Sequence, residues 1–169
     1  PKIIIKSEIE KNKEKLDKLK NELEKVDINL PVAEKDIVQI TSTREAYFKK
    51  MKEFAGNAKK SIVYTARHWK VDAELIRLLQ EKIKHGVQIR GIGPVSSKEE
   101  KNISWLKEIG VKIKKAELKE THFAVYDNSF VVISLRKEPE KSDYNSIFIK
   151  SETLAEILTN HFNSIWKKV

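Results

Sequence analysis

Two stretches of the sequence repeat one pattern, and this repeat constrains the fold more than any other feature. Each stretch is a glycine followed by alternating apolar and polar residues, GVQIR at 86–90 and GVKIK at 110–114. A glycine behind a helical pattern commonly ends the helix, and the alternation predicts a strand. Between them, Ser97 and Glu100 have the spacing of a capping box ahead of a helical pattern that runs to Ile109. The repeat predicts a strand–helix–strand unit whose parallel strands are joined by a right-handed crossover.

The same alternation of strands and helices continues on both sides of this unit. Apolar and β-branched runs predict further strands, at 37–40, 61–66 and 147–149. Side chains that cap helices stand where three helices should begin, at Thr43, Asp72 and Ser151. We therefore expect an α/β domain over residues 36–169, with a mixed sheet and helices on both of its faces.

The stretch 121–134 predicts an antiparallel hairpin, which is what makes the sheet mixed. Two apolar arms are joined at 127–129, where Asp and Asn accept the positive φ that tight turns need. Alternation puts His122, Ala124 and Tyr126 on one face of the first arm. A histidine at the start of such a strand can be a catalytic base or nucleophile, or it can be an ordinary core residue.

Residues 7–27 read as one long helix with a seven-residue apolar repeat. The repeat consists of Ile9, Leu16, Leu19, Leu23 and Val26. Two apolar positions per heptad make a narrow stripe that suits a coiled-coil seam. We expect residues 1–30 to form a dimerising coiled coil or linker helix. The alternative is a surface helix that packs along its own domain.

Composition excludes several classes of protein. The 169 residues include no cysteine, so disulfides, thiolate metal sites and cysteine nucleophiles are absent. No run of 18 apolar residues and no signal peptide is present, which makes the cytoplasm the expected compartment. The net charge of +9 favours a polyanionic partner such as nucleic acid. However, the lysines are interleaved with acids, and a solvated Lys/Glu surface explains the charge equally well.

Few motifs in the sequence carry recognisable chemistry. The run Gly91-Ile92-Gly93-Pro94 lacks the third glycine of a dinucleotide loop, so we interpret it as a turn that brings backbone close to a site. No zinc-protease, calcium-loop or phosphate-loop motif occurs, and we expect neither a metal nor another cofactor. His68 and His122 fall at strand ends that can open on one edge of the sheet, where ligands bind in α/β folds.

We expect a small polar or anionic effector, such as a sugar or sugar phosphate, at that edge. Arginine offers a fork for a carboxylate or phosphate, tryptophan a flat apolar surface, and glycine a close approach to backbone. The predicted ligand-binding residues are Arg67, His68, Trp69, Gly91, Gly93, Thr121, His122 and Ser134. In the alternative, Trp69 closes the core and Arg67 pairs with a local acid.

The segment from the strand at 37–40 to the last helix resembles one half of the phospholipase D fold. Each half of that superfamily supplies H-x-K-x4-D at such a hairpin, with Gly-Ser on the next strand. His122 matches the histidine and Ser134 the serine, but Ala124 stands at the lysine position and Ser129 at the aspartate position. Ile133 stands at the glycine position. The resemblance implies the fold without the catalytic lysine and aspartate.

The order of a helical arm followed by one such half is similar to the C-terminal part of archaeal TrmB-type transcriptional regulators. In the family that this order resembles, a winged helix-turn-helix domain is followed by a coiled coil and then by a sensor domain of this kind. The resemblance implies the non-catalytic dimerisation and effector-sensing region of a homodimer that binds DNA through a domain outside this chain. Two alternatives stay open: a phosphodiesterase or nuclease that uses His122 across a dimer, and a basic module that binds nucleic acid directly.

Overall fold

The computed structural model of the chain describes residues 38–118, 122–135 and 145–169. The chain divides into a unit of Pro1–Lys35 and a unit of Asp36–Val169. The predicted coiled-coil helix over 7–27, with its whole apolar repeat, lies outside the described residues, and so does Thr121.

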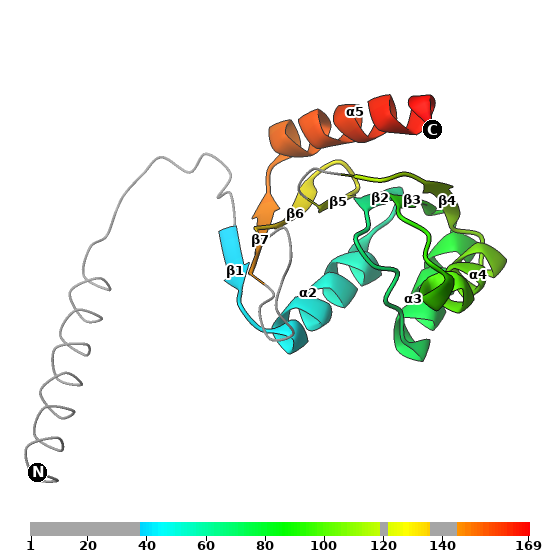
Figure 1. Cartoon of the computed structure of the whole chain (residues 1–169). Helices are drawn as coiled ribbons and strands as arrows, with labels where there is room; N and C mark the ends of the chain where they lie inside the picture. Colours follow the sequence, from blue (N-terminus) through cyan, green and yellow to red (C-terminus); the bar gives the residue numbers. More distant parts are fainter. Residues whose placement is uncertain (1–37, 119–121, 136–144) are drawn as a thin grey trace, which may run out of the picture. The chain divides into compact units, whose positions relative to one another are not determined.

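A seven-stranded mixed sheet forms the centre of the Asp36–Val169 unit (Figure 1). Its order is β1-β7-β6-β5-β2-β3-β4, in which β2, β3 and β4 run parallel and the other neighbours pair antiparallel. The strands are β1 (Val38–Thr41), β2 (Ser61–Thr65), β3 (Gln88–Gly93), β4 (Lys112–Lys115), β5 (Phe123–Tyr126), β6 (Phe130–Ser134) and β7 (Ser146–Lys150). The predicted mixed sheet is confirmed.

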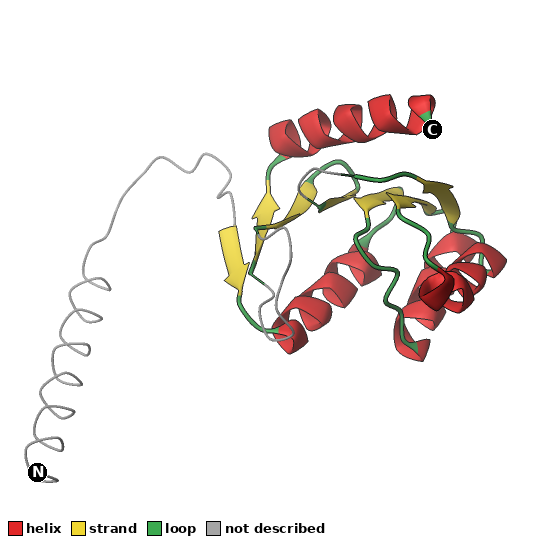
Figure 2. Ribbon diagram, viewed as in Figure 1, coloured by secondary structure: helices red, strands yellow, loops and turns green. Residues whose placement is uncertain are grey.

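Helices cover both faces of the sheet, as the sequence predicts (Figure 2). On one face lie α2 (Arg44–Asn57), α3 (Ala73–Lys84) and α4 (Glu100–Glu108), the last preceded by the 3-10 turn η1 (Ser97–Glu99). On the other face lies α5 (Glu152–Lys168), which packs on β2, β5 and β6. The sheet therefore separates two apolar cores. None of the described helices combines the length and apolar character needed to cross a membrane.

The predicted helix starts and stops are formed by the expected side chains. Thr43, Asp72 and Ser151 each accept a hydrogen bond from the backbone N–H three residues on, at 3.2, 2.8 and 3.3 Å. Gly86 and Gly110 follow α3 and α4 with φ of +89° and +103°, a conformation that glycine adopts without steric cost. These local signals are strong because each satisfies backbone groups that a helix end leaves unpaired.

The start of α4 differs from the predicted capping box at Ser97 and Glu100. Both residues lie inside the 3-10 turn or the helix, and no side-chain hydrogen bond caps α4. Instead, the hydroxyl of Ser96 donates to one oxygen of the Glu99 carboxylate at 2.7 Å. The other oxygen accepts from the backbone N–H of Trp69 at 2.9 Å. The carboxylate that forms hydrogen bonds at this helix start is therefore that of Glu99 and not that of Glu100. It binds the backbone of Trp69, which is distant in the sequence.

The hairpin forms as predicted and is tied to the neighbouring strand through its turn. Asp127 and Asn128 have φ of +51° and +54°, and the N–H of Ser129 donates to the carbonyl of Tyr126 at 3.1 Å. The Asp127 carboxylate accepts three backbone N–H groups at the start of β2, at 2.7, 2.7 and 2.9 Å. Charge-assisted hydrogen bonds of this kind are stronger than neutral ones, so this aspartate holds β5 in register with β2.

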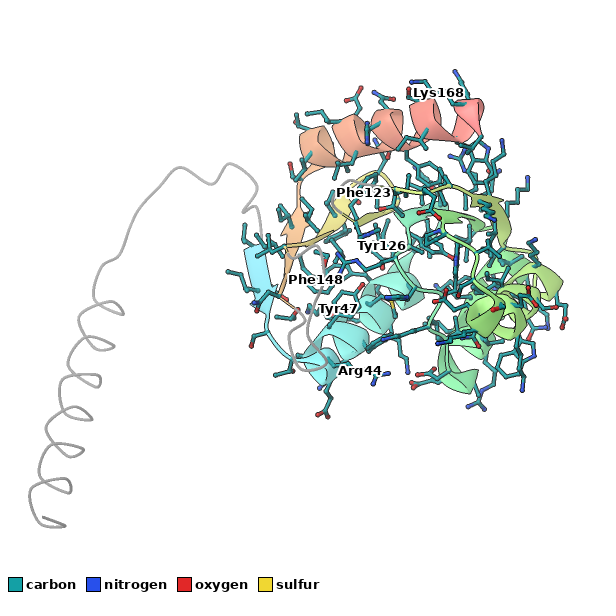
Figure 3. All side chains as sticks on the ribbon, viewed as in Figure 1. Arg44, Tyr47, Phe123, Tyr126, Phe148 and Lys168 are labelled. Carbon is teal, nitrogen blue, oxygen red and sulfur yellow. The ribbon has the colours of Figure 1, made fainter. Side chains whose placement is uncertain are left out.

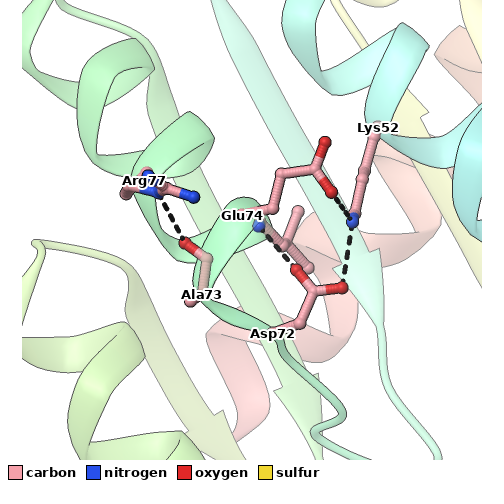
Figure 4. A network of polar contacts seen from close by, with 6 residues as sticks. Lys52, Asp72, Ala73, Glu74 and Arg77 are labelled. Atoms are coloured by element: carbon pink, nitrogen blue, oxygen red, sulfur yellow. Dashed lines mark hydrogen bonds and ion pairs between the residues drawn. The ribbon is translucent and has the colours of Figure 1, made fainter.

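An ion-pair network joins the two helices that flank the cavity described below (Figure 4). The ammonium group of Lys52 on α2 lies 2.9 Å from the carboxylate of Asp72, and it also contacts Glu74 in the first turn of α3. Glu74 and Asp72 together raise the pKa of Lys52. Exposed ion pairs contribute little to stability, so we assign this network an orienting role.

Candidate ligand-binding cavity

A cavity of about 1010 Å³ lies between the sheet and the helices α2 and α3. Figure 3 shows Arg44 and Tyr47 on α2 below Tyr126 on the sheet. The loop that follows β2, residues 66–71, forms another part of the wall. The volume matches that of ligand pockets, which are roughly 300–1,000 Å³.

His122 lies at one end of this cavity, just before β5. It is half-buried, and its Nδ1 atom is buried without a hydrogen-bond partner among the described residues. Burial lowers the pKa of His122, and the nearby charges of Arg67 and His68 lower it further. A hydrogen bond to the backbone of Thr65 acts in the opposite direction. A neutral imidazole with one unsatisfied nitrogen is a ready partner for a ligand, because a buried polar atom without a partner carries a free-energy cost.

Arg67 and His68 bring charge to the same end of the cavity from the loop after β2. Both residues line the cavity together with His122, and the charge of Arg67 lowers the pKa of His122. The ring of His68 is exposed, and its Nδ1 lies 3.3 Å from a carboxylate oxygen of Glu99. The loop after β2 and His122 therefore contribute to the wall of one cavity.

Trp69 is a core residue, as in the alternative that the sequence left open. Its side chain is only 2% exposed, and the indole N–H donates to the backbone carbonyl of Pro94. The ring packs edge-on against Tyr64, with centroids 5.8 Å apart and an interplanar angle of 68°. Its backbone carbonyl accepts from the side-chain amide of Asn102 at 2.7 Å. Trp69 thus forms a fixed wall of the cavity and offers no open face to a sugar.

Gly91 and Gly93 do not line the cavity, contrary to the expectation that a ligand approaches backbone there. A Cβ atom at Gly91 would lie 2.7 Å from the ring of Tyr64 and 3.0 Å from that of Trp69. At Gly93 it would collide with the backbone carbonyl of Ala66. These glycines are needed for the close packing of the protein itself, because aromatic side chains and a neighbouring strand end fill the space.

Five predicted site residues line the cavity together, and the interior of the cavity contains residues that the sequence did not single out. The five are Arg67, His68, Trp69, His122 and Ser134. The missed group is largely aromatic and consists of Tyr47, Met51, Tyr64 and Tyr126. The predicted alternation along the hairpin did place Tyr126 on the same face as His122. The contribution of α2 could not be predicted, because it depends on how that helix docks on the sheet.

The two positions that depart from the phospholipase D motif have different surroundings. Ala124 faces the cavity between Tyr64 on β2 and Val132 on β6, to which it is paired. Ser129 lies in the hairpin turn, where its carbonyl accepts from the N–H of Ser151 at 2.9 Å. The motif ammonium and carboxylate are therefore both replaced. The described residues also contain no group of three or more His, Cys, Asp or Glu side chains that could hold a metal ion.

Comparison with solved structures shows the same fold in two groups of proteins. The chain matches TrmBL2, an archaeal chromatin protein whose structure shows a novel mode of DNA binding, with a TM-score of 0.62 and 17% identity over 96% of this chain. It spans 65% of the length of TrmBL2. It also matches Nuc from Salmonella typhimurium, a phospholipase D family member, with a TM-score of 0.66 and 18% identity, over 79% of this chain and 95% of Nuc. NucT from Helicobacter pylori gives a TM-score of 0.66 and 8% identity, over 79% of this chain and 97% of NucT.

At these identities the structural matches establish the fold alone. No curated protein matches the sequence. The model of the family "Transcriptional regulator TrmB, EBD N-terminal subdomain", in which EBD denotes the effector-binding domain, matches residues 37–169. The chain therefore belongs to the family of the N-terminal subdomain of the effector-binding domain of TrmB transcriptional regulators.

Proposed function

We propose that this chain is the dimerising, effector-sensing part of a DNA-binding transcriptional regulator and that it catalyses no reaction. The observation that carries the proposal is the cavity at His122, in a domain of a regulator family, where alanine replaces the motif lysine. A cavity with an unpartnered imidazole nitrogen supports binding. The loss of the motif cation and carboxylate argues against turnover.

The effector is a small polar or anionic molecule, such as a sugar or sugar phosphate, which binds where Arg67, His122 and Ser134 meet. A guanidinium has five N–H donors in a fixed fork, and the imidazole and hydroxyl add one hydrogen bond each. The whole protein binds DNA through a winged helix-turn-helix outside this chain and acts in the cytoplasm. The likeness to TrmBL2, a chromatin protein, supports the DNA partner.

A homodimer is expected because the apolar repeat over 7–27 suits a second helix better than a domain surface. The substitution Leu16→Lys puts a charge into the predicted seam and should convert the dimer to monomer, which sedimentation equilibrium measures directly. The matched control is Lys18→Glu, a charge change outside the seam, which should leave the mass of the dimer unchanged. A monomeric parent chain at tens of micromolar, unaffected by Leu16→Lys, would contradict the proposed dimer.

One alternative deserves a direct test because the fold of phospholipase D family members is present. A nucleophilic histidine needs a cation that holds the phosphate of the substrate. It also needs a carboxylate that orients its partner group. Ala124 and Ser129 supply neither, so we expect no release of p-nitrophenolate from bis-p-nitrophenyl phosphate. The double variant Ala124→Lys, Ser129→Asp serves as the comparison. Cleavage by the unmodified chain that His122→Ala abolishes would show an enzyme instead of a sensor.

A further inference from the structure

The cavity changes character along β5, from a polar end to an apolar end. The side chains at 122, 124 and 126 share one face of the strand, and successive members of that face are about 6.8 Å apart. His122 marks one end, where its carbonyl accepts from the N–H of Ser134, and Arg67 lines the same cavity. Tyr126 marks the other end, roughly 14 Å away. This length suits a molecule with two different halves better than a compact, uniformly polar one.

The apolar part of the cavity, which we call the aromatic slot, is lined by Tyr64, Ala124 and Tyr126. Tyr64 and Val132 flank Ala124 in the sheet, so the small side chain leaves space between two larger ones. Met51 from α2 also lines this part of the cavity. Burial raises the pKa of Tyr64 and of Tyr126, so both phenols stay uncharged at neutral pH. A flat apolar ring fits this part of the cavity, whereas the hydroxyls of a sugar would find their hydrogen-bond partners at the polar end, near His122 and Ser134.

The charged groups of the cavity wall favour an anion. Among the described residues, the charged side chains of the cavity wall are three cations, Arg44, Arg67 and Lys70, and one carboxylate, that of Glu117. Ile62, Ala124 and Val132, which lie toward Tyr126, contribute no charge. An anionic group of the ligand therefore belongs at the Arg67–His122 end, with its uncharged body in the aromatic slot.

We propose that the cavity binds an arylcarboxylate, a flat ring that carries one acid group. The ring lies over Ala124 between Tyr64 and Tyr126. The carboxylate accepts one hydrogen bond from the guanidinium of Arg67 and, with His122 in the imidazolium form that a bound anion favours, a second from its Nδ1–H, the atom without a partner among the described residues. This inference rests on the proposed effector site and specifies the class of ligand that the site accepts.

Isothermal titration calorimetry of the full chain with three probes distinguishes the contribution of the ring to the affinity from that of the charge. Phenylacetate has both the ring and the charge, phenylacetamide has the ring without the charge, and acetate has the charge without the ring. We expect phenylacetate to bind at least tenfold more tightly than either of the others. Equal affinity for acetate or for phenylacetamide would overturn the proposal.

Two variants and one spectrum place the ligand in the slot. Ala124→Leu fills the slot and should weaken phenylacetate binding at least tenfold, while Ala73→Leu adds the same side chain at an exposed position of α3 and should not. Because Ala124→Leu could disturb the core, NMR of the unmodified chain gives an independent reading. Phenylacetate should shift the ring signals of His122 and leave those of His85, which lies outside the cavity wall.

Titration with glucose 6-phosphate separates failure of this inference from failure of the proposed function. If glucose 6-phosphate binds and shifts His122 but phenylacetate does not, the arylcarboxylate is wrong and the effector site stands. If phenylacetate binds without any change at His122, or binds Ala124→Leu as it binds the parent chain, the slot is wrong. If no probe perturbs His122, both the slot and the proposed effector site fail.

Discussion

His122 connects the hairpin to the candidate cavity. Its backbone carbonyl accepts from the N–H of Ser134 at 2.9 Å, which fixes it to β6 at the hairpin end. Its ring lines the cavity with Nδ1 unsatisfied, next to the charge of Arg67. The sequence placed this residue correctly at a strand start, but it could not decide between a core histidine and a ligand partner. That decision depends on burial and on neighbours far away in the chain.

The protonation of His122 should be visible in the stability of the chain. Burial and the charges of Arg67 and His68 hold the pKa of this imidazole below its ordinary value of 6.5. Below pH 6.5 the unfolded chain therefore binds the proton first, so stability is lost as pH falls from 6.5 to the folded-state pKa. His122→Gln removes this contribution. Urea unfolding at several pH values between 7.5 and 5 should show a weaker pH dependence for the variant, and an identical pH dependence would contradict the assigned environment.

The glycines of β3 allow a close approach of other atoms to the backbone, but the sequence does not reveal which atoms these are. The run Gly91-Ile92-Gly93 suggests that a ligand approaches the backbone. A glycine pattern alone cannot distinguish a ligand from a side chain of the protein. In the structure the approach is real, but the groups that come close are Tyr64, Trp69 and the carbonyl of Ala66.

Substitution of these glycines should therefore affect stability through packing. Gly93→Ala forces a methyl group onto the Ala66 carbonyl and should cost about 1–3 kcal/mol, as overpacking typically does. The control is Gly56→Ala in α2, where the nearest atom would be an ordinary 3.7 Å away. That change should be neutral or stabilise the chain by up to about 1 kcal/mol, because alanine favours helix. Equal effects in chemical denaturation would show that Gly93 is not confined as described.

At the scale of elements, local sequence signals gave the helices and the hairpin, and long-range partners decided the rest. The caps at Thr43, Asp72 and Ser151 are satisfied within one helical turn, so three residues of sequence suffice to predict them. The start of α4 is different, because Glu99 binds the backbone of Trp69, thirty residues away. The order of the strands follows the same division: the βαβ unit and the hairpin are local, whereas the pairing of β5 with β2 is not.

At the scale of the molecule, the candidate site arises from segments that the sequence keeps apart. The loop after β2 and the start of β5, which the sequence predicts at one edge of the sheet, both contribute to the cavity wall. The sequence does not predict the aromatic slot, since it depends on how α2 and α3 dock on the face of the sheet that carries Tyr64 and Tyr126 (Figure 1). With the slot, the candidate site extends from the ends of the strands into the space between the sheet and the helices α2 and α3.

The central claim is that this cavity senses a small molecule, and a thermal-shift screen tests it most directly. The panel contains sugars, sugar phosphates, nucleotides and organic acids, each applied to the parent chain, to Arg67→Ala and to His122→Ala. A ligand at 100 times its dissociation constant adds about 2.7 kcal/mol to stability, which raises the melting temperature by several degrees. We predict that at least one class raises the melting temperature of the parent chain, and that both variants lose this shift while their unliganded melting temperatures stay close to that of the parent. A screen without any shift, or a binder that both variants retain unchanged, would contradict the account.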